Sequence, residues 1–112
     1  MTPSHITTHV LDTGTGRPAQ GITAQLSAQS ATGWDPVAAG TTDADGRIRS
    51  LGPEQVDPGT YRITFATGEY FGSTGTGTFF PEVTLTFSVT STEHYHVPLL
   101  LSPFAYSTYR GS

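Results

Sequence analysis

The histidines and the last four residues are the parts of this chain whose side chains could do chemistry. Histidine is the only side chain with an unperturbed pKa near neutral pH, so it is the first candidate for general acid–base work. His94 and His96 lie two residues apart and therefore share one face of an extended strand. The sequence ends Tyr109-Arg110-Gly111-Ser112. If this end enters a site, we expect it to bring a hydroxyl, a guanidinium and a terminal carboxylate together.

The histidine pairs also have simpler explanations. Two imidazoles on one strand face, as at His94 and His96, can form half of a zinc site. No residue at a suitable spacing offers a third metal ligand, so we predict no metal. A pair of polar strand residues, one of them exposed, is a more frequent arrangement than a zinc half-site. His5 and His9 also share a face, but they lie about 13 Å apart on an extended strand and cannot both serve one small centre.

Two further motifs do not support an ion or phosphate site. Asp43-Ala44-Asp45-Gly46 matches part of a calcium loop, but Gly52 stands where such a loop requires a bidentate glutamate, so we predict a hairpin turn. The glycine-rich residues 72–78 lack the lysine of a phosphate loop and are predicted to form a flexible loop. The chain has no Gly-x-Ser-x-Gly elbow, so a covalent serine mechanism has little support.

Composition excludes several classes of partner. The 112 residues carry five lysines and arginines against nine acidic residues, a net charge of −4. A chain so poor in cations is not expected to bind nucleic acid or an anionic membrane. No cysteine is present, which excludes disulfides and thiolate ligands, and no apolar run approaches membrane-spanning length. Without a leader-like N-terminus we expect a cytoplasmic protein. Because only 35% of residues are hydrophobic, we expect a partner subunit to complete part of the core.

Short alternating runs separated by turn residues predict an all-β sandwich or barrel in a single domain, residues 1–112. The clearest strand covers residues 83–90, where apolar and polar side chains alternate. About eight strands are predicted, at residues 5–12, 21–30, 34–42, 47–50, 60–67, 83–90, 93–102 and 104–110. A short helix follows Thr67, the predicted N-cap. Pro98 indicates a bulge or an edge in the seventh strand.

The last two strands place several polar side chains on matching faces. Alternation aligns His96 with Pro98 and Leu100, and on the next strand it aligns Ser107 with Tyr109 and Gly111. If the strands pair through the turn at Ser102 and Pro103, both sets line one surface. Arg47 and Arg49 share a face of a separate short strand. Periodicity alone leaves open whether these groups converge, and ordinary packing explains each of them separately.

The C-terminal segment carries a family resemblance. Residues 94–112, HYHVPLLLSPFAYSTYRGS, closely resemble the end of 5-hydroxyisourate hydrolases, the transthyretin-related enzymes of urate degradation. Further matching segments occur in register along the whole chain: Thr8-His9-Val10-Leu11-Asp12, Gly16-Arg17-Pro18-Ala19, Thr42-Asp43-Ala44-Asp45-Gly46-Arg47, Gly59-Thr60-Tyr61 and Phe79-Phe80-Pro81-Glu82-Val83. The terminal Tyr-Arg-Gly-Ser is the most specific of these marks.

The resemblance implies a transthyretin-like two-sheet sandwich of eight strands with one short helix, assembled as a homotetramer around a central channel. It implies hydrolysis of a small-molecule substrate, 5-hydroxyisourate, to 2-oxo-4-hydroxy-4-carboxy-5-ureidoimidazoline, without a metal or organic cofactor. By matching position, the catalytic residues are His9, Arg47, His96 and Ser112, and the substrate-binding residues are His9, Arg47, Tyr109, Arg110 and Gly111. Which histidine acts as the general base stays open.

Two other functions are compatible with the same scaffold. Transthyretin itself is a hormone carrier that shares the fold and much of the Leu-Leu-Ser-Pro segment, and fold does not imply function. A non-catalytic β-sandwich interaction module is the second alternative. The histidines, Arg47 and the terminal tetrapeptide favour the hydrolase, because a hormone channel would have apolar or lysine-containing walls.

Overall fold

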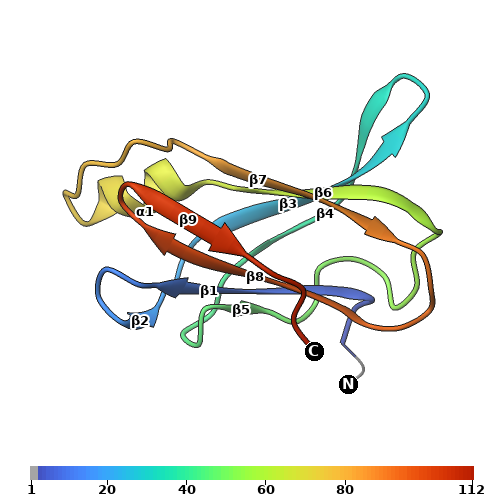
Figure 1. The fold of residues 1–112 in the computed structure, drawn as a ribbon, viewed down its shortest axis with the longest axis horizontal. Coiled ribbons are helices and arrows are strands. Elements are labelled where there is room, and N and C mark those ends of the chain that lie inside the picture. Colours follow the sequence, from blue (N-terminus) through green and yellow to red (C-terminus); the bar gives the residue numbers. More distant parts are fainter. Residues whose placement is uncertain (1–2) are drawn as a thin grey trace.

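The computed structural model describes residues 3–112, which form two facing β-sheets and one short helix (Figure 1). The elements are β1 (Ile6–Asp12), β2 (Arg17–Pro18), β3 (Thr23–Ser30), β4 (Gly33–Thr41), β5 (Arg47–Ile48), β6 (Gly59–Phe65), α1 (Thr67–Ser73), β7 (Val83–Val89), β8 (Tyr95–Ser102) and β9 (Ala105–Thr108). One sheet has the order β2-β1-β8-β9, with β5 also pairing β1, and the other has the order β4-β3-β6-β7. The predicted two-sheet sandwich with one short helix is confirmed.

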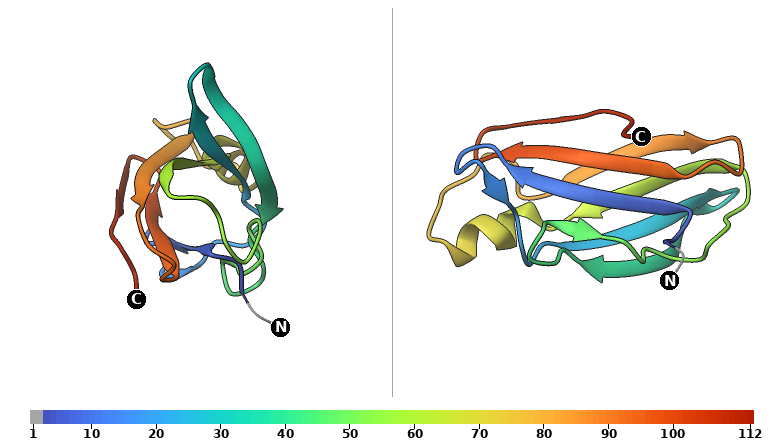
Figure 2. Two further views of the ribbon diagram at one scale, coloured as in Figure 1. Left: turned by 90° about the vertical axis from the view of Figure 1, so that its right-hand side faces the viewer. Right: turned by 90° about the horizontal axis from the view of Figure 1, so that it is seen from below.

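Alternating side chains from both sheets form the core between the layers. Figure 2 shows the ribbon of the two layers from the end and from below. On β6, Tyr61, Ile63 and Phe65 are buried, and between them Arg62 and Thr64 are partly exposed. On β7 the predicted alternation is present, although Phe87 is only partly buried. Such a two-residue period lets each strand present one apolar face to the facing sheet and one polar face to water.

The pairing of β1 with β8 dominates the sheet that carries the candidate site. The two strands run parallel, with Ile6 opposite Tyr95 and Asp12 opposite Leu101. Parallel strands cannot be joined by a tight hairpin, and all four strands of the other sheet precede β8 in the chain. Because the two strands lie far apart in the sequence, no local turn signal predicts that they pair.

Each predicted strand is present with shifted ends, but one short strand was missed, and the predictions for a turn, a helix cap and Pro98 are wrong. The two-residue strand β2 was not predicted, because it is too short to show alternation. The turn at residues 43–46 leads into β5, which pairs with β1 instead of folding back on β4, so it is not a hairpin turn. The helix includes Thr67 and its N-cap residue is Ala66, since the Thr67 hydroxyl donates to the Phe80 carbonyl (3.0 Å).

The position of Pro98 also differs from the prediction. Pro98 lies inside β8, which is a central strand between β1 and β9, and its register with β1 is unbroken. The paired part of β9 ends at Thr108, opposite Leu99, so the β9 ladder stops before it reaches the proline. The N–H that Pro98 lacks therefore lies beyond the paired part of β9, so no hydrogen bond between β8 and β9 is lost.

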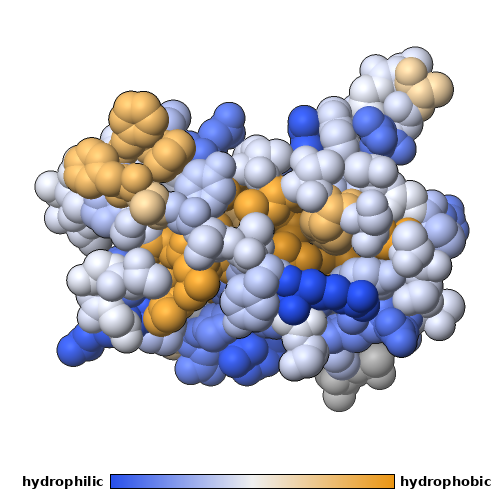
Figure 3. Space-filling model, viewed as in Figure 1, coloured by the Kyte–Doolittle hydropathy of each residue, from blue (hydrophilic) through white to orange (hydrophobic). Residues whose placement is uncertain are grey.

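Two apolar areas lie on the surface, one of them between two edge strands. Strands β7 and β9 are edge strands of their sheets, and an apolar area lies between them in Figure 3. Phe79 and Phe104 are 71% and 72% exposed, in loops joined by the bond from the Phe79 N–H to the Pro103 carbonyl (2.9 Å). Within residues 3–112 no helix is long and apolar enough to cross a membrane.

Candidate active site

Three neighbouring strands place the predicted catalytic side chains on one face of a sheet. In the antiparallel pair of β1 and β5, His9 lies directly opposite Arg47. In the parallel pair of β1 and β8, Thr7 lies opposite His96. Since side chains repeat every two residues along a strand, Thr7 and His9 project to the same side of β1. Arg47, His9 and His96 therefore converge, although their positions are far apart in the sequence.

A tight turn fixes Arg47 opposite His9. The Asp43 carboxylate accepts hydrogen bonds from the N–H groups of Asp45 (2.9 Å) and Arg47 (3.0 Å), which is the role of aspartate in an Asx turn. Gly46 has a φ of +75°, and a Cβ there would collide with the Val10 carbonyl oxygen. The Gly46 carbonyl in turn accepts from the Val10 N–H (2.8 Å). Only glycine suits this position, and its contact with Val10 docks the turn against β1.

The C-terminal segment closes the other side of the site. After β9, the Gly111 N–H donates to the His96 carbonyl (2.9 Å), so the chain pairs again with β8 at the histidine itself. A Cβ on Gly111 would lie 2.6 Å from Cδ2 of His96, closer than two carbons can approach. The lack of a side chain at Gly111 is therefore what allows the tail to lie against the imidazole ring.

These strands and the tail enclose a cavity of about 450 Å³. Its walls are formed by Pro3, Thr7, Thr8, His9, Arg47, Arg49, His94, His96, Tyr109, Gly111 and Ser112. Of the residues predicted from the sequence, all but Arg110 line this cavity. The cavity is large enough for a small planar molecule and its wall combines cationic, imidazole and hydroxyl groups, as specific small-ligand sites require.

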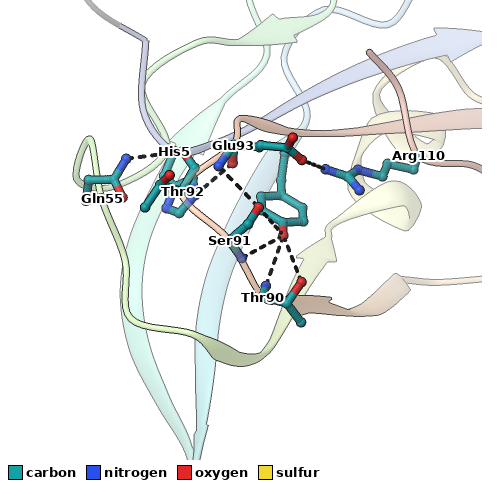
Figure 4. A network of polar contacts seen from close by, with 8 residues as sticks. His5, Gln55, Thr90, Ser91, Thr92, Glu93 and Arg110 are labelled. Carbon is teal, nitrogen blue, oxygen red and sulfur yellow. Dashed lines mark hydrogen bonds and ion pairs between the residues drawn. The ribbon is translucent and has the colours of Figure 1, made fainter.

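The Arg110 side chain lies elsewhere. Its guanidinium carbon is 4.4 Å from the centre of the Tyr95 ring, and its Nη2 is 3.5 Å from Oε2 of Glu93. Figure 4 shows this ion pair beside Ser91 and Thr90, whose N–H groups donate to the Tyr95 hydroxyl (3.1 and 2.9 Å). Arg110 thus anchors the backbone next to Gly111 instead of facing the cavity.

The surroundings of His9 and His96 keep both imidazoles neutral. Burial lowers the pKa of His9, and the Arg47 guanidinium lowers it further, while the Asp45 backbone and the Asp43 and Asp45 carboxylates act in the opposite direction. Burial also lowers the pKa of His96, followed by the charges of Arg47, His9 and His94. The rings of His9 and His96 are 6.3 Å apart and tilted by 31°. At neutral pH both rings can therefore accept a proton.

The other two histidines have different surroundings. His94 Nε2 is 2.9 Å from the Thr7 hydroxyl, and this same hydroxyl is 2.8 Å from Nδ1 of His96. His5 is 3% exposed and contacts backbone groups of Val56 and Glu93, away from the cavity. Within the part of the chain that the structure describes, no group of three or more His, Cys, Asp or Glu side chains is placed to hold a metal ion.

Several residues of the cavity wall were missed by sequence reasoning. Thr7 and Thr8 resemble ordinary strand threonines, and Arg49 was noted only as sharing a face with Arg47. The signal for Thr7 was present, since it precedes His9 by two residues and must share its face. No local signal marked Pro3.

A profile of the HIUase/Transthyretin family matches residues 6–111. The chain belongs to this family. The 5-hydroxyisourate hydrolase of Salmonella typhimurium is 50% identical over 109 residues, which are 96% of this chain and 80% of that protein. The solved structure of Klebsiella pneumoniae 5-hydroxyisourate hydrolase is 36% identical, with a TM-score of 0.86, covering 96% of this chain and 98% of that chain.

A member of the same family with a different ligand is equally similar in fold. The sea bream transthyretin structure, solved in complex with thyroxine, is 34% identical with a TM-score of 0.89 and covers 95% of this chain and 93% of that chain. The two solved structures cannot be separated by fold similarity, so the backbone alone does not decide between hydrolysis and carriage. The side chains of the cavity have to decide it.

Proposed function

We propose that this chain hydrolyses 5-hydroxyisourate to 2-oxo-4-hydroxy-4-carboxy-5-ureidoimidazoline in urate degradation. The observation that carries the proposal is the convergence of His9, Arg47 and His96 on one cavity that Gly111 and Ser112 also line. Two neutral imidazoles beside a guanidinium suit the attack of water on a polar, nitrogen-rich ring. They suit a hydrophobic hormone poorly.

In the proposed reaction an imidazole of His9 or His96 takes a proton from water. The water oxygen bonds to a ring carbonyl carbon, the carbon–nitrogen bond of the ring breaks, and the departing nitrogen receives the proton from the imidazolium. Arg47 orients the substrate and stabilises negative charge that develops on the carbonyl oxygen. Because Arg47 also lowers the pKa of both histidines, it keeps the base unprotonated between turnovers.

The C-terminal residues complete the binding site in this proposal. Tyr109, Gly111 and Ser112 line the cavity and contact the substrate edge, with the Ser112 hydroxyl next to the reacting groups. Arg110 contributes by holding the tail through Tyr95 and Glu93. The Arg110 side chain is itself 58% exposed, so these contacts stabilise the tail only modestly. An Arg110→Met variant should then raise KM by a few fold, whereas a direct substrate contact requires a much larger rise.

The direct test follows freshly generated 5-hydroxyisourate by its absorbance, with and without the protein. We expect decay far faster than the spontaneous reaction. Thyroxine binding without any acceleration would instead support the carrier function that the sea bream protein's ligand suggests. A non-catalytic interaction module instead predicts a monomer that gives no acceleration and whose function is untouched by deletion of residues 110–112. The proposed site needs that segment.

A homotetramer is part of the same proposal. It is supported by the edge strands β7 and β9 and by a mainly apolar groove of about 360 Å³ lined in part by Leu85, Phe87 and Val97. Exposed apolar areas of this kind mark protein–protein contacts. Sedimentation at micromolar concentration should give four times the chain mass of 11.9 kDa. A monomer at that concentration contradicts the proposed tetramer. The cytoplasmic location expected from the sequence also stays a prediction.

A further inference from the structure

The Thr7 hydroxyl lies between two imidazoles. Its Oγ1 is 2.8 Å from Nδ1 of His96 and 2.9 Å from Nε2 of His94. Thr7 is 5% exposed, so water competes poorly for these bonds. The two rings are 6.3 Å apart and both line the candidate active site. The hydroxyl therefore forms a hydrogen-bonded bridge from exposed His94 to His96.

One hydroxyl hydrogen ties the tautomers of the two rings together. A hydroxyl donates one hydrogen bond and can accept others. When Thr7 donates to Nε2 of His94, Nδ1 of His96 must carry a hydrogen and donate to Thr7. When Thr7 donates to Nδ1 of His96, Nε2 of His94 must carry the hydrogen. A neutral imidazole has a single N–H, so only the first arrangement leaves Nε2 of His96 with a free lone pair.

We propose that Thr7 and His94 are positioning residues that hold His96 in its Nδ1–H tautomer and thereby make Nε2 of His96 the proton acceptor for water. The proposal rests on the hydrolase function above and assigns the base that sequence left open. Nδ1 of His96 is engaged by Thr7, so Nε2 is the nitrogen that remains for the cavity. Arg47 lines the same cavity, and its charge favours a lone pair over an N–H hydrogen pointing toward it.

The bridge also suits the proton transfer itself. When Nε2 of His96 takes the proton from water, the ring becomes an imidazolium that must donate from both nitrogens. Its Nδ1–H bond to Thr7 is already in place, so no group has to rearrange as charge develops. The proton on Nε2 then passes to the departing ring nitrogen of the substrate, and the original tautomer is restored.

The tautomer can be observed without substrate by nitrogen NMR of the full chain labelled with 15N-histidine. At pH 8 we expect His96 to show a protonated Nδ1 and a bare Nε2, with His96→Asn identifying its signals. In Thr7→Val the pattern should shift toward the Nε2–H form. A hydrogen on Nε2 of His96 in the unmodified protein overturns the proposal. It would leave the hydrolase function standing, which the decay of 5-hydroxyisourate tests separately.

Kinetics supply the second readout. We expect Thr7→Val to lower kcat by about tenfold or more with KM little changed, up to the 10²–10⁴ that loss of a general base costs. Thr7→Ser restores the hydroxyl and should recover most of kcat. The control is Thr67→Val, which removes another buried hydroxyl whose bond is to the Phe80 carbonyl (3.0 Å), far from the site. Equal kcat in Thr7→Val and Thr67→Val overturns the proposal.

A pair of variants at exposed His94 keeps the test independent of folding at Thr7. His94→Leu removes the acceptor for the Thr7 hydrogen, so kcat should fall as in Thr7→Val. His94→Gln places an amide oxygen near the position of Nε2, and kcat should recover. Equal kcat values for the two variants contradict a role for His94 as acceptor.

Discussion

His5 directly precedes β1 and His96 lies on the neighbouring strand β8, and the two differ in the groups that their ring nitrogens contact. Nδ1 of His5 accepts from the Val56 N–H (3.0 Å), and Nε2 of His5 donates to the Glu93 carbonyl (2.9 Å). His96 uses Nδ1 on the Thr7 hydroxyl (2.8 Å), and within residues 3–112 its Nε2 forms no hydrogen bond. The first ring is a link between loops, whereas the second keeps one nitrogen free for a ligand.

This difference separates a structural histidine from a chemical one. His5 is 3% exposed and both nitrogens are saturated by backbone groups, so it has no capacity left for proton transfer. His96 is half-buried, faces His9 across 6.3 Å and shares its cavity with Arg47. Residue type and strand position alone would rank the two alike. The same substitution made at both positions should therefore have opposite consequences.

The largest effect is expected at the active site. In His96→Asn the amide keeps a polar atom near the position of Nδ1 for Thr7 but removes Nε2. We expect hydrolysis of 5-hydroxyisourate to slow by about 10²–10⁴-fold, the usual cost of losing a general base. Urea unfolding should show a stability close to that of the unmodified protein. Near-normal turnover in this variant would remove His96 from the mechanism.

The matched change at His5 should act on stability instead. In His5→Asn the Val56 N–H can still be satisfied, but the bond to the Glu93 carbonyl is lost and a gap replaces part of the ring. We expect a loss of about 1–3 kcal/mol in the free energy of unfolding. The folded fraction should keep its kcat. A stable variant with impaired kcat would show that the comparison is wrong.

A smaller effect tests the contact between the tail and His96. A methyl group at Gly111 would lie 2.6 Å from Cδ2 of His96, so the ring or the tail must shift in Gly111→Ala. We expect kcat to fall by about 10- to 100-fold, the cost of a misplacement on the order of 1 Å. Gly77→Ala is the control, because nothing lies within 4 Å of the added carbon there. Equal activities for the two variants would separate the tail from the site.

The smallest effect concerns pH. The pKa values of His9 and His96 both lie below their ordinary value of 6.5, because burial and Arg47 disfavour the charged rings. The active, neutral form should therefore persist as pH falls to 6.5 and be lost only below it. A pH profile of kcat/KM checks this directly, and Arg47→Gln should move the acid limb upward. An acid limb above 6.5 in the unmodified protein contradicts the electrostatic account.

Local patterns predict much of the fold. Alternation at Tyr61, Ile63 and Phe65, and again along β7, is visible because each strand has one buried face and is bounded by turn residues. The sequence does not predict the parallel pairing of β1 with β8, because the two strands come from opposite ends of the chain and no local turn joins them. Likewise, β5 pairs with β1 and not with β4, which periodicity cannot show.

The candidate site, like the fold, is only partly predictable from local sequence patterns. The resemblance supplied His9, Arg47 and His96, but their convergence depends on pairings across the sheet that spacing does not encode. The position of Arg110 depends on its contacts with the Tyr95 ring and Glu93, which its place in the sequence does not predict. The bridging role of Thr7 requires two separate strands in register, so it appears only in the folded chain.

The central claim is that His9 and His96 act as one unit in a single cavity, and a double-mutant cycle tests it most directly. Hydrolysis of 5-hydroxyisourate would be measured for His9→Asn, His96→Asn and the double variant. Residues that act together give strongly non-additive losses. The account predicts that the double variant is about as slow as the slower single variant. Losses that multiply, or a single variant with unchanged kcat/KM, would contradict it.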